Sequence, residues 1–243
     1  MTDPSRLELS HVFPVLIAQR SWPDSQALNG ALRDLVLNEP RRSQGVKISN
    51  VGGWHSAKDL HERSEPCIRE LVERIRAMTR DLVYETVDNP LEAHLENWEI
   101  EAWANINRRG NYNSAHIHEP KFVWSGVYYV DPGDVDPPSG DIKFEDRSGV
   151  AKEVLRNADP FEREVAVRPE AGLMIMFPVT LFHYVEPYLG QRPRISIAFN
   201  LANPAFTIPV YDYQRPTWWH EPPRIVHELR RLKARLGFRK PLR

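Results

Sequence analysis

Three histidines have the spacing of a metal site built on two strands. His116 and His118 stand two positions apart in Asn-Tyr-Asn-Ser-Ala-His-Ile-His-Glu-Pro, and His183 follows a glycine turn and an apolar run. Residues i and i+2 of an extended strand face the same side, so the first two imidazoles project together. With a third imidazole from another strand, they can coordinate a divalent metal and leave coordination positions open for substrates. Two polar residues on an exposed strand face are the alternative interpretation of the pair.

Arg194 adds a fixed cation to this group. It stands 11 positions after His183 and begins the apolar run Arg-Ile-Ser-Ile-Ala-Phe-Asn. Because a buried guanidinium is costly unless an anion pairs with it, we expect Arg194 to bind a carboxylate through a fork of two hydrogen bonds. A surface position is the alternative for this residue. Arg192 is close by but precedes Pro193, so it ranks second.

Several segments of the chain together resemble one enzyme family. They are residues 49–56, 103–107, 110–118, 125–130, 177–178, 194–196 and 199–200, with His183. Over about residues 45 to 205 they resemble the Fe(II)- and 2-oxoglutarate-dependent oxygenases related to prolyl hydroxylases. One position departs from the pattern, because the wider superfamily usually has Asp or Glu where this chain has His118.

The resemblance implies a fold, two cofactors and a reaction. The implied fold is a double-stranded β-helix, or jelly roll, and the cofactors are Fe(II) and 2-oxoglutarate. His116, His118 and His183 would then ligate iron, while Arg194 binds the distal carboxylate of 2-oxoglutarate with help from Ser196. The expected reaction is hydroxylation of an unactivated C–H bond in an amino acid, a peptide or a small metabolite.

Other polar residues are weaker candidates for the same site. The amide of Asn105 and the phenol of Tyr128 can orient a keto acid or substrate, although core or turn positions explain them equally well. Tyr128 and Tyr129 face opposite sides of one strand, so only one can reach the site, and we expect Tyr128. Arg147 can bind a substrate anion, with an ion pair to a neighbouring surface carboxylate as the alternative.

Two other functions stay open on the sequence alone. A three-histidine cupin-type dioxygenase or isomerase without 2-oxoglutarate is favoured by the missing carboxylate at position 118, whereas Arg194 and Ser196 argue against it. A non-catalytic binding module on the same scaffold is disfavoured by the intact histidines and arginine. Glu119 is the adjacent carboxylate, but it faces away from His118 unless a bulge turns it inward.

The rest of the sequence predicts the elements that must position these residues. Helical apolar spacing marks about residues 24–35 and 64–82, and from about residue 91 the period changes to that of strands. Strands are expected at residues 98–107, 122–130, 141–144, 164–167, 173–177 and 194–200. This order predicts an α+β, mainly β fold in which N-terminal helices buttress a jelly roll.

We expect residues 1–243 to form a single oxygenase domain. Its helical N-terminal part covers about residues 1–90, its jelly-roll core about 91–210, and a basic C-terminal helix about 222–237. The last helix has an apolar stripe, so packing on the domain is favoured over recognition of an acidic partner.

The composition limits the classes of partner that the protein is expected to bind. A hydrophobic content of 41% in 243 residues supports a sizeable core, and a net charge of −1 offers no field that would attract nucleic acid or an anionic membrane. No stretch approaches the roughly 20 apolar residues of a membrane span, and the first residues lack a signal-peptide pattern. Cys67 is the only cysteine, so we expect a cytoplasmic protein with a small-molecule or peptide substrate. The sequence leaves a homodimer open.

Overall fold

Two amphipathic helices precede the main strands along the chain. The computed structural model describes residues 15–41, 43–86, 97–134, 136–145, 147 and 164–204. Helix α1 (Gln26–Asn38) buries Leu28, Leu32 and Val36, which recur every four residues on one face. Helix α2 (Pro66–Thr86) begins at a proline, which is tolerated in a first turn because its missing N–H would have no partner there.

The strands form two antiparallel sheets. The major sheet has the order β1 (Ala18–Ser21), β9 (Leu173–Pro178), β6 (Trp124–Asp131), β11 (Arg194–Ala202), β4 (Glu99–Asn107) and β3 (Trp54–His55). The minor sheet has the order β2 (Asn50–Val51), β5 (Tyr112–His116), β10 (Phe182–Val185), β7 (Ile142–Glu145) and β8 (Glu164–Val167). Two short 3-10 turns, η1 (Glu39–Arg41) and η2 (Leu60–Glu62), complete the described elements.

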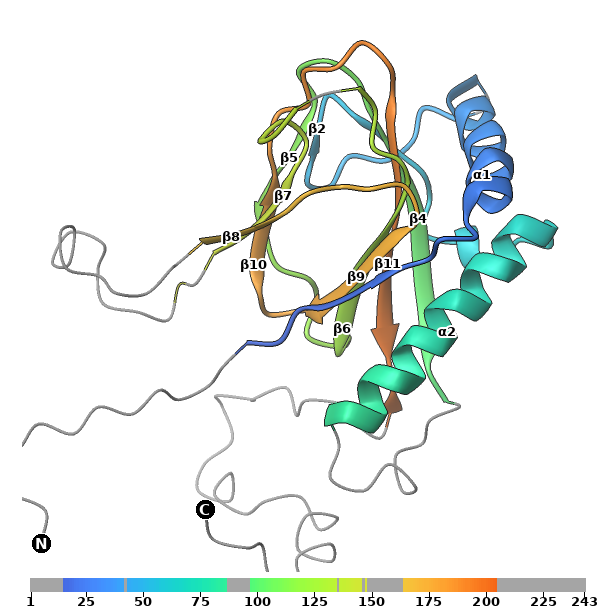
Figure 1. Cartoon of the computed structure of the whole chain (residues 1–243), viewed down its shortest axis with the longest axis vertical. Helices are drawn as coiled ribbons and strands as arrows, with labels where there is room; N and C mark the ends of the chain where they lie inside the picture. The colour runs from blue at the N-terminus through green and yellow to red at the C-terminus, as the bar shows by residue number, and fades with distance from the viewer. Residues whose placement is uncertain are drawn as a thin grey trace, which may run out of the picture. The chain divides into compact units, whose positions relative to one another are not determined.

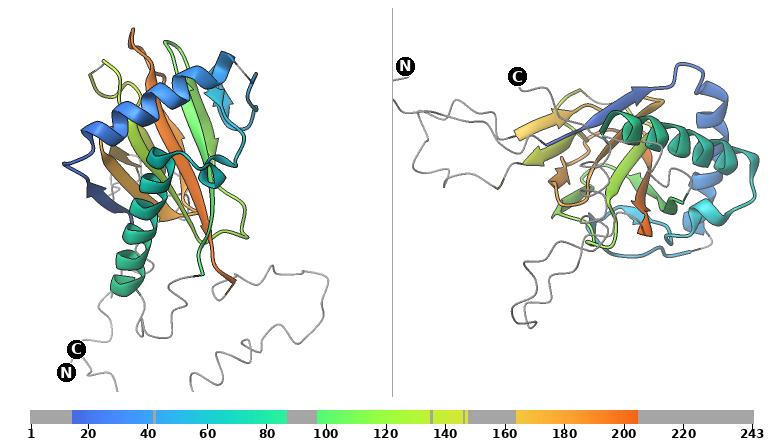
Figure 2. Two further views of the ribbon diagram at one scale, coloured as in Figure 1. Left: turned by 90° about the vertical axis from the view of Figure 1, so that its right-hand side faces the viewer. Right: turned by 90° about the horizontal axis from the view of Figure 1, so that it is seen from below.

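The two sheets face each other, and the helices cover the outer face of the major sheet (Figure 1). Seen from the helix side, α1 and α2 lie in front of β4 and β11 (Figure 2, left). This architecture confirms the predicted mainly β jelly roll buttressed by N-terminal helices.

Each face of the major sheet has its own apolar core. The outer core lies under the helices and includes Ile106, Tyr128 and Ile197. The inner core lies between the sheets and includes Tyr129 and Phe177. Because side chains alternate along a strand, successive buried residues of the major sheet face these two cores in turn.

The predicted strands 98–107, 122–130, 141–144, 164–167, 173–177 and 194–200 correspond to observed strands, with ends that differ by up to two residues. Strand β10 was not expected, because His183 was predicted to follow a strand end. Pro178 does end β9, but the chain turns back at once and His183 lies within the next strand. The predicted basic helix at about residues 222–237 lies outside the described residues.

No helix among the described residues is long and apolar enough to cross a bilayer.

Candidate metal centre and anion pocket

Two neighbouring strands of the minor sheet bring the three predicted histidines together. Strands β5 and β10 pair so that His116 and His183 are direct partners, with ring centroids 4.4 Å apart. His118 lies two residues beyond β5, where its backbone N–H donates to the carbonyl of Val179 at 3.0 Å. One ligand-capable atom from each of the three rings lies within 4.8 Å of the others. The three imidazoles therefore form one cluster.

A register shift in β5 sets the direction of the first histidine. His183 pairs with His116, and Val185 pairs with Asn113, so two steps along β10 correspond to three steps along β5. Such a bulge inserts one extra residue and bends the strand. Consequently both Asn113 and His116 lie opposite residues of β10 that share a face.

Two of the rings are oriented by carbonyl groups of the chain itself. Nδ1 of His116 lies 2.7 Å from the carbonyl oxygen of Ser114, and Nδ1 of His183 lies 2.8 Å from that of Leu181. A carbonyl only accepts, so each Nδ1 must carry the proton and donate. This tautomer leaves Nε2 of each ring with a free lone pair, which is the arrangement found in metal-binding histidines.

Burial keeps the cluster uncharged. Desolvation, followed by the neighbouring imidazoles, lowers the pKa of His118 to about 2. Desolvation also lowers the pKa of His183 to about 3 and the pKa of His116 below its ordinary value. Neutral imidazole is the form that binds a metal. Nε2 of His118 and Nε2 of His183 lie 3.2 Å apart, close enough for one cation to contact both nitrogens.

Glu119 is not part of the cluster. Its side chain is exposed and forms an ion pair with Lys121 at 3.2 Å. Within the described part of the chain, the cluster of three histidines is the only group of its kind, and it contains no carboxylate. The donor set thus fits a divalent metal held by three neutral nitrogens, with the other coordination positions open.

Arg194 occupies the inner face of the major sheet, where it is only 2% exposed. Its Nη1 lies 3.4 Å from Oγ of Ser196, and its guanidinium stands 5.3 Å from the ring centre of Tyr129. Its Nε is buried and has no hydrogen-bond partner among the described residues. Burial lowers the pKa of this guanidinium, which is the cost that an anionic ligand would offset.

The residues around Arg194 also have unused hydrogen-bonding capacity. In the strand register, Arg194 pairs with Asn107 and Ser196 pairs with Asn105 of β4, while Ser196 also pairs with Tyr129 of β6. The structure provides no partner within the described ranges for four buried atoms here: Nε of Arg194, Oδ1 of Asn105, Nδ2 of Asn107 and the hydroxyl of Tyr129. Buried polar groups normally have partners, so the three donors in this set, on Arg194, Asn107 and Tyr129, fit a binding site for an anion.

The metal cluster and the anion pocket share the space between the sheets. Trp103 and Asn105 are successive residues on one face of β4, and the ring of Trp103 lies 6.1 Å from that of His118. Phe177 of the inner core lies 4.7 Å from His183. A ligand that spans from the histidines toward Arg194 would therefore pass along an aromatic wall.

Tyr128 lies on the wrong face to contribute. It belongs to the outer core, and its hydroxyl donates to Oδ1 of Asn29 on α1 at 2.6 Å. The expected cofactor role of Tyr128 is therefore corrected, since its neighbour Tyr129 faces Arg194 instead. The alternation along β6 required that only one tyrosine reach the site, but it did not say which one.

Two other residues have positions that their spacing did not indicate. His55 is 3% exposed and stacks on Trp103, with ring centroids 5.4 Å apart, although it precedes His116 by about 60 residues. Arg147 forms an ion pair with Glu145 at 3.1 Å and lies over the ring of Phe182. The surface alternative for Arg147 is thus the one observed.

Residues 101–200 match a family model described as "Putative 2OG-Fe(II) oxygenase". This segment runs from β4 into β11 and contains all three histidines, Arg194 and Ser196. No curated protein sequence matches this chain.

Solved structures of low sequence identity share the fold. A prolyl-4-hydroxylase from Pseudomonas putida is 14% identical with a TM-score of 0.55, over 77% of this chain and 92% of that one. A prolyl hydroxylase from Trichoplax adhaerens, in complex with a peptide fragment of hypoxia inducible factor, is 13% identical with a TM-score of 0.51, over 77% and 83%. The non-heme α-ketoglutarate-dependent epimerase SnoN from nogalamycin biosynthesis is 12% identical with a TM-score of 0.56, over 77% of each chain.

Proposed function

We propose that this chain is a 2OG-Fe(II) oxygenase, the family whose model matches residues 101–200, and that it hydroxylates an unactivated C–H bond of an amino acid, a peptide or a small metabolite. It is an oxygenase that uses Fe(II) and 2-oxoglutarate. The observation that supports the site assignment best is the pairing of three neutral imidazoles with a buried arginine that lacks an anion.

We propose that the iron ligands are Nε2 atoms of His116, His118 and His183. The carbonyl groups of Ser114 and Leu181 hold two of the rings in the required tautomer. Since all three ligands are neutral, the bound metal keeps its full double charge, which favours chelation by the anionic keto acid. Bound Fe(II) and 2-oxoglutarate together supply the oxidising power for C–H cleavage with O2.

Arg194 is assigned to the distal carboxylate of 2-oxoglutarate. Its guanidinium can form charge-assisted hydrogen bonds to that group, and the hydroxyls of Ser196 and Tyr129 are placed to donate beside it. Asn105, which pairs with Ser196 across the strands, can orient the keto acid through its amide. The aromatic rings of Trp103 and Phe177 flank His118, where they would exclude water from the bound cofactor.

The substrate is proposed only as a class. The structure from Trichoplax adhaerens holds a peptide, whereas the epimerase SnoN is named for a different outcome on the same fold. Hydroxylation is preferred to halogenation, because three protein ligands leave no free position for a halide besides the keto acid. We further propose a cytoplasmic location, consistent with a single free cysteine, and we leave a homodimer as an arrangement to be tested.

The decisive experiment measures succinate formed from 2-oxoglutarate with added Fe(II), together with the mass of products from a substrate panel. We expect succinate from the parent protein and the gain of one oxygen atom in a substrate. Arg194→Ala should abolish succinate formation at low 2-oxoglutarate, whereas Arg192→Ala should retain it, because Arg192 is exposed on a loop. Oxygen consumption that does not depend on 2-oxoglutarate would instead support the three-histidine cupin alternative.

A further inference from the structure

The loop between β6 and β7 packs on the side chain of Arg194 through a glycine. Gly140 in this loop is buried and has φ +74. A Cβ placed on Gly140 would lie 3.2 Å from Cδ of Arg194 and 3.4 Å from its Nε. The same Cβ would lie 3.2 Å from Cδ2 of Tyr188. The missing side chain at position 140 therefore leaves the space that the stem of Arg194 occupies.

Hydrogen bonds hold the loop on both sides of Gly140. On one side, the hydroxyl of Ser139 accepts from the backbone N–H of Leu189 at 2.8 Å. On the other side, the carbonyl of Asp141 accepts from the N–H of Glu186 at 2.9 Å. Both partners belong to the loop between β10 and β11, so the backbone of Gly140 is tied to the segment that leads into Arg194.

Tyr188 and Asp134 form a second connection between the same two loops. Tyr188 is 0% exposed, and its hydroxyl accepts from the N–H of Asp134 at 3.2 Å and lies 2.5 Å from the carbonyl oxygen of Arg192. Oδ1 of Asp134 accepts from the N–H groups of Gln191 and Arg192 at 2.9 and 3.0 Å. The two loops are therefore joined on both sides of the point where Gly140 meets Arg194.

The side chain of Arg194 is held less firmly than this loop. Its hydrogen bond from Nη1 to Oγ of Ser196 is long, at 3.4 Å, and its Nε has no partner among the described residues. A side chain added at position 140 would push against Cδ and would stand beside the unpartnered Nε. Arg194 could yield to it by a small rotation of its stem, which would leave the preferred rotamer.

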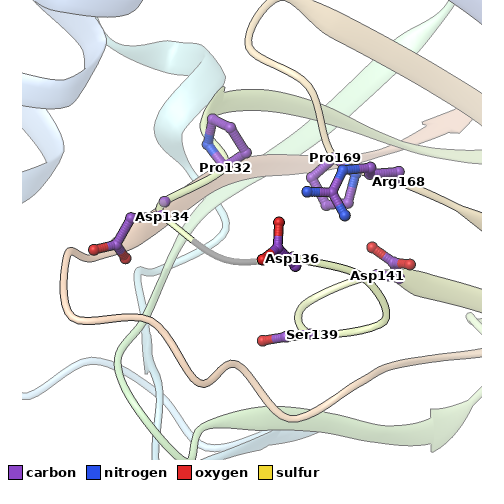
Figure 3. Close-up of a pocket in the computed structure, with 8 residues that line it drawn as sticks. Pro132, Asp134, Asp136, Ser139, Asp141, Arg168 and Pro169 are labelled. Carbon is purple, nitrogen blue, oxygen red and sulfur yellow. The ribbon is translucent and has the colours of Figure 1, made fainter.

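The residues next to Gly140 offer the loop a competing way to yield. Ser139 and Asp141 line a cavity of about 280 Å³ together with Asp136 and Arg168 (Figure 3). A shift of the loop toward this space would stretch the hydrogen bonds from Leu189 and Glu186 described above. Because losing such bonds costs more than a small rotation of one side chain, we expect Arg194 to move and not the loop.

We propose that Gly140 is a positioning residue for 2-oxoglutarate. Because it has no side chain, Arg194 keeps its rotamer and presents an uncovered Nε to the distal carboxylate. A larger residue at position 140 should therefore weaken the binding of 2-oxoglutarate only through that carboxylate. This inference rests on the proposed function, because it requires that Arg194 bind the distal carboxylate.

Calorimetry of the Mn(II)-loaded protein with two keto acids tests this inference. The second keto acid is 2-oxopentanoate, which has the carbon chain of 2-oxoglutarate but no distal carboxylate. We expect Gly140→Ala to weaken 2-oxoglutarate binding about 5-fold, the effect of one side chain held off its rotamer, and to leave 2-oxopentanoate binding unchanged. In an Arg194→Ala background, Gly140→Ala should have no further effect on 2-oxoglutarate, because its influence passes through Arg194.

Gly110→Ala is the matched control. Gly110 also has a positive φ, +85, but a Cβ placed on it meets nothing within 4 Å. Both substitutions strain the backbone and should lower the melting temperature, whereas only Gly140→Ala should weaken 2-oxoglutarate binding. Equal affinities of the two variants for 2-oxoglutarate would overturn the inference. An equal loss of affinity for both keto acids in Gly140→Ala would also overturn it, since that pattern indicates general damage to the site.

A second variant applies if Gly140→Ala does not fold. Tyr188→Phe keeps the ring beside Gly140 but removes the hydroxyl that joins the two loops. It should weaken 2-oxoglutarate binding about 3-fold, the effect of one lost hydrogen bond, without changing 2-oxopentanoate binding. Unchanged binding of 2-oxoglutarate would overturn the inference alone. If the parent binds both keto acids equally well, the assignment of Arg194 in the proposed function is wrong, and this inference fails with it.

Discussion

The metal end and the anion end of the site are prepared in different ways. At the metal end, backbone carbonyls already hold two of the three histidines in a ligand tautomer. At the anion end, Arg194, Tyr129 and Asn105 are buried with polar atoms that have no partner within the described ranges. The first region is oriented before a ligand arrives, whereas the second is completed only by the ligand.

This difference indicates how each end contributes to the free energy of ligand binding. The donor atoms of the metal end belong to neutral groups whose positions are fixed by the pairing of β5 with β10. The anion end instead bears the cost of a buried guanidinium, and an anion that removes this cost binds more tightly than one contacting an exposed arginine. The two ends should therefore respond separately to substitution.

The largest effect is expected at the metal end. His118→Ala removes one of three ligands, so we expect metal affinity to fall by more than about 100-fold, which exceeds the loss typical of groups that only orient a ligand. Glu119→Ala, its matched control, should keep the parent's occupancy because Glu119 is exposed and paired with Lys121. Metal analysis of both variants decides the point. Full metal occupancy in His118→Ala would refute the three-histidine set, and metal loss in Glu119→Ala would indicate a carboxylate ligand.

Arg194→Ala tests the other end. Truncating a charge-assisted, bidentate contact costs on the order of 3 kcal/mol, so 2-oxoglutarate should bind roughly 100-fold more weakly. Metal affinity without 2-oxoglutarate should not change, because the histidines lie on or just beyond strands of the other sheet. Calorimetry with Mn(II) and then 2-oxoglutarate separates the two steps. An unchanged affinity for the keto acid would show that the anion end has been assigned to the wrong residue.

A smaller effect concerns pH and the metal-free protein. The pKa values of His118 and His183 are about 2 and about 3 in the folded protein, below their ordinary value. The unfolded chain therefore binds more protons, and folding stability must fall as pH drops below about 6.5. Each histidine contributes a slope of up to about 1.4 kcal/mol per pH unit. Denaturant unfolding between neutral and mildly acid pH should show this loss, and His183→Gln should reduce it; a flat profile in the parent contradicts the burial of neutral imidazoles.

The smallest effects come from two adjacent tyrosines, which provide a matched pair. Tyr129→Phe removes a donor from the anion end, so 2-oxoglutarate should bind about 5-fold more weakly, equivalent to roughly 1 kcal/mol. Tyr128→Phe removes the hydrogen bond to Asn29 and should lower the free energy of unfolding by about 1 kcal/mol without changing cofactor affinity. Binding and unfolding measured on both variants should give opposite patterns. If Tyr128→Phe weakens binding while Tyr129→Phe does not, the faces of β6 have been assigned the wrong way round.

Much of the site was predictable because its signals are local. The two-residue spacing of His116 and His118, and the arginine that begins an apolar strand, are properties of short segments. The mainly β jelly roll is confirmed, and residues 101–200 match the model of the predicted family, whose cofactors are the predicted Fe(II) and 2-oxoglutarate. The assignment of the individual site residues to iron and 2-oxoglutarate stays a prediction, although the structure brings the three histidines into one cluster.

Other features depend on pairing between distant segments. Alternation indicated that Tyr128 and Tyr129 face opposite sides, but only the packing of α1 on β6 decides which side is the outer core. The stacking of His55 on Trp103 requires the pairing of β3 with β4, and the approach of Gly140 to Arg194 requires a loop to fold onto β11. The sequence by itself determined the residue types and which neighbours share a face, because these follow from the backbone period. Only the tertiary structure decided which face is interior and which distant groups meet, because register and sheet closure are set by contacts far apart along the chain.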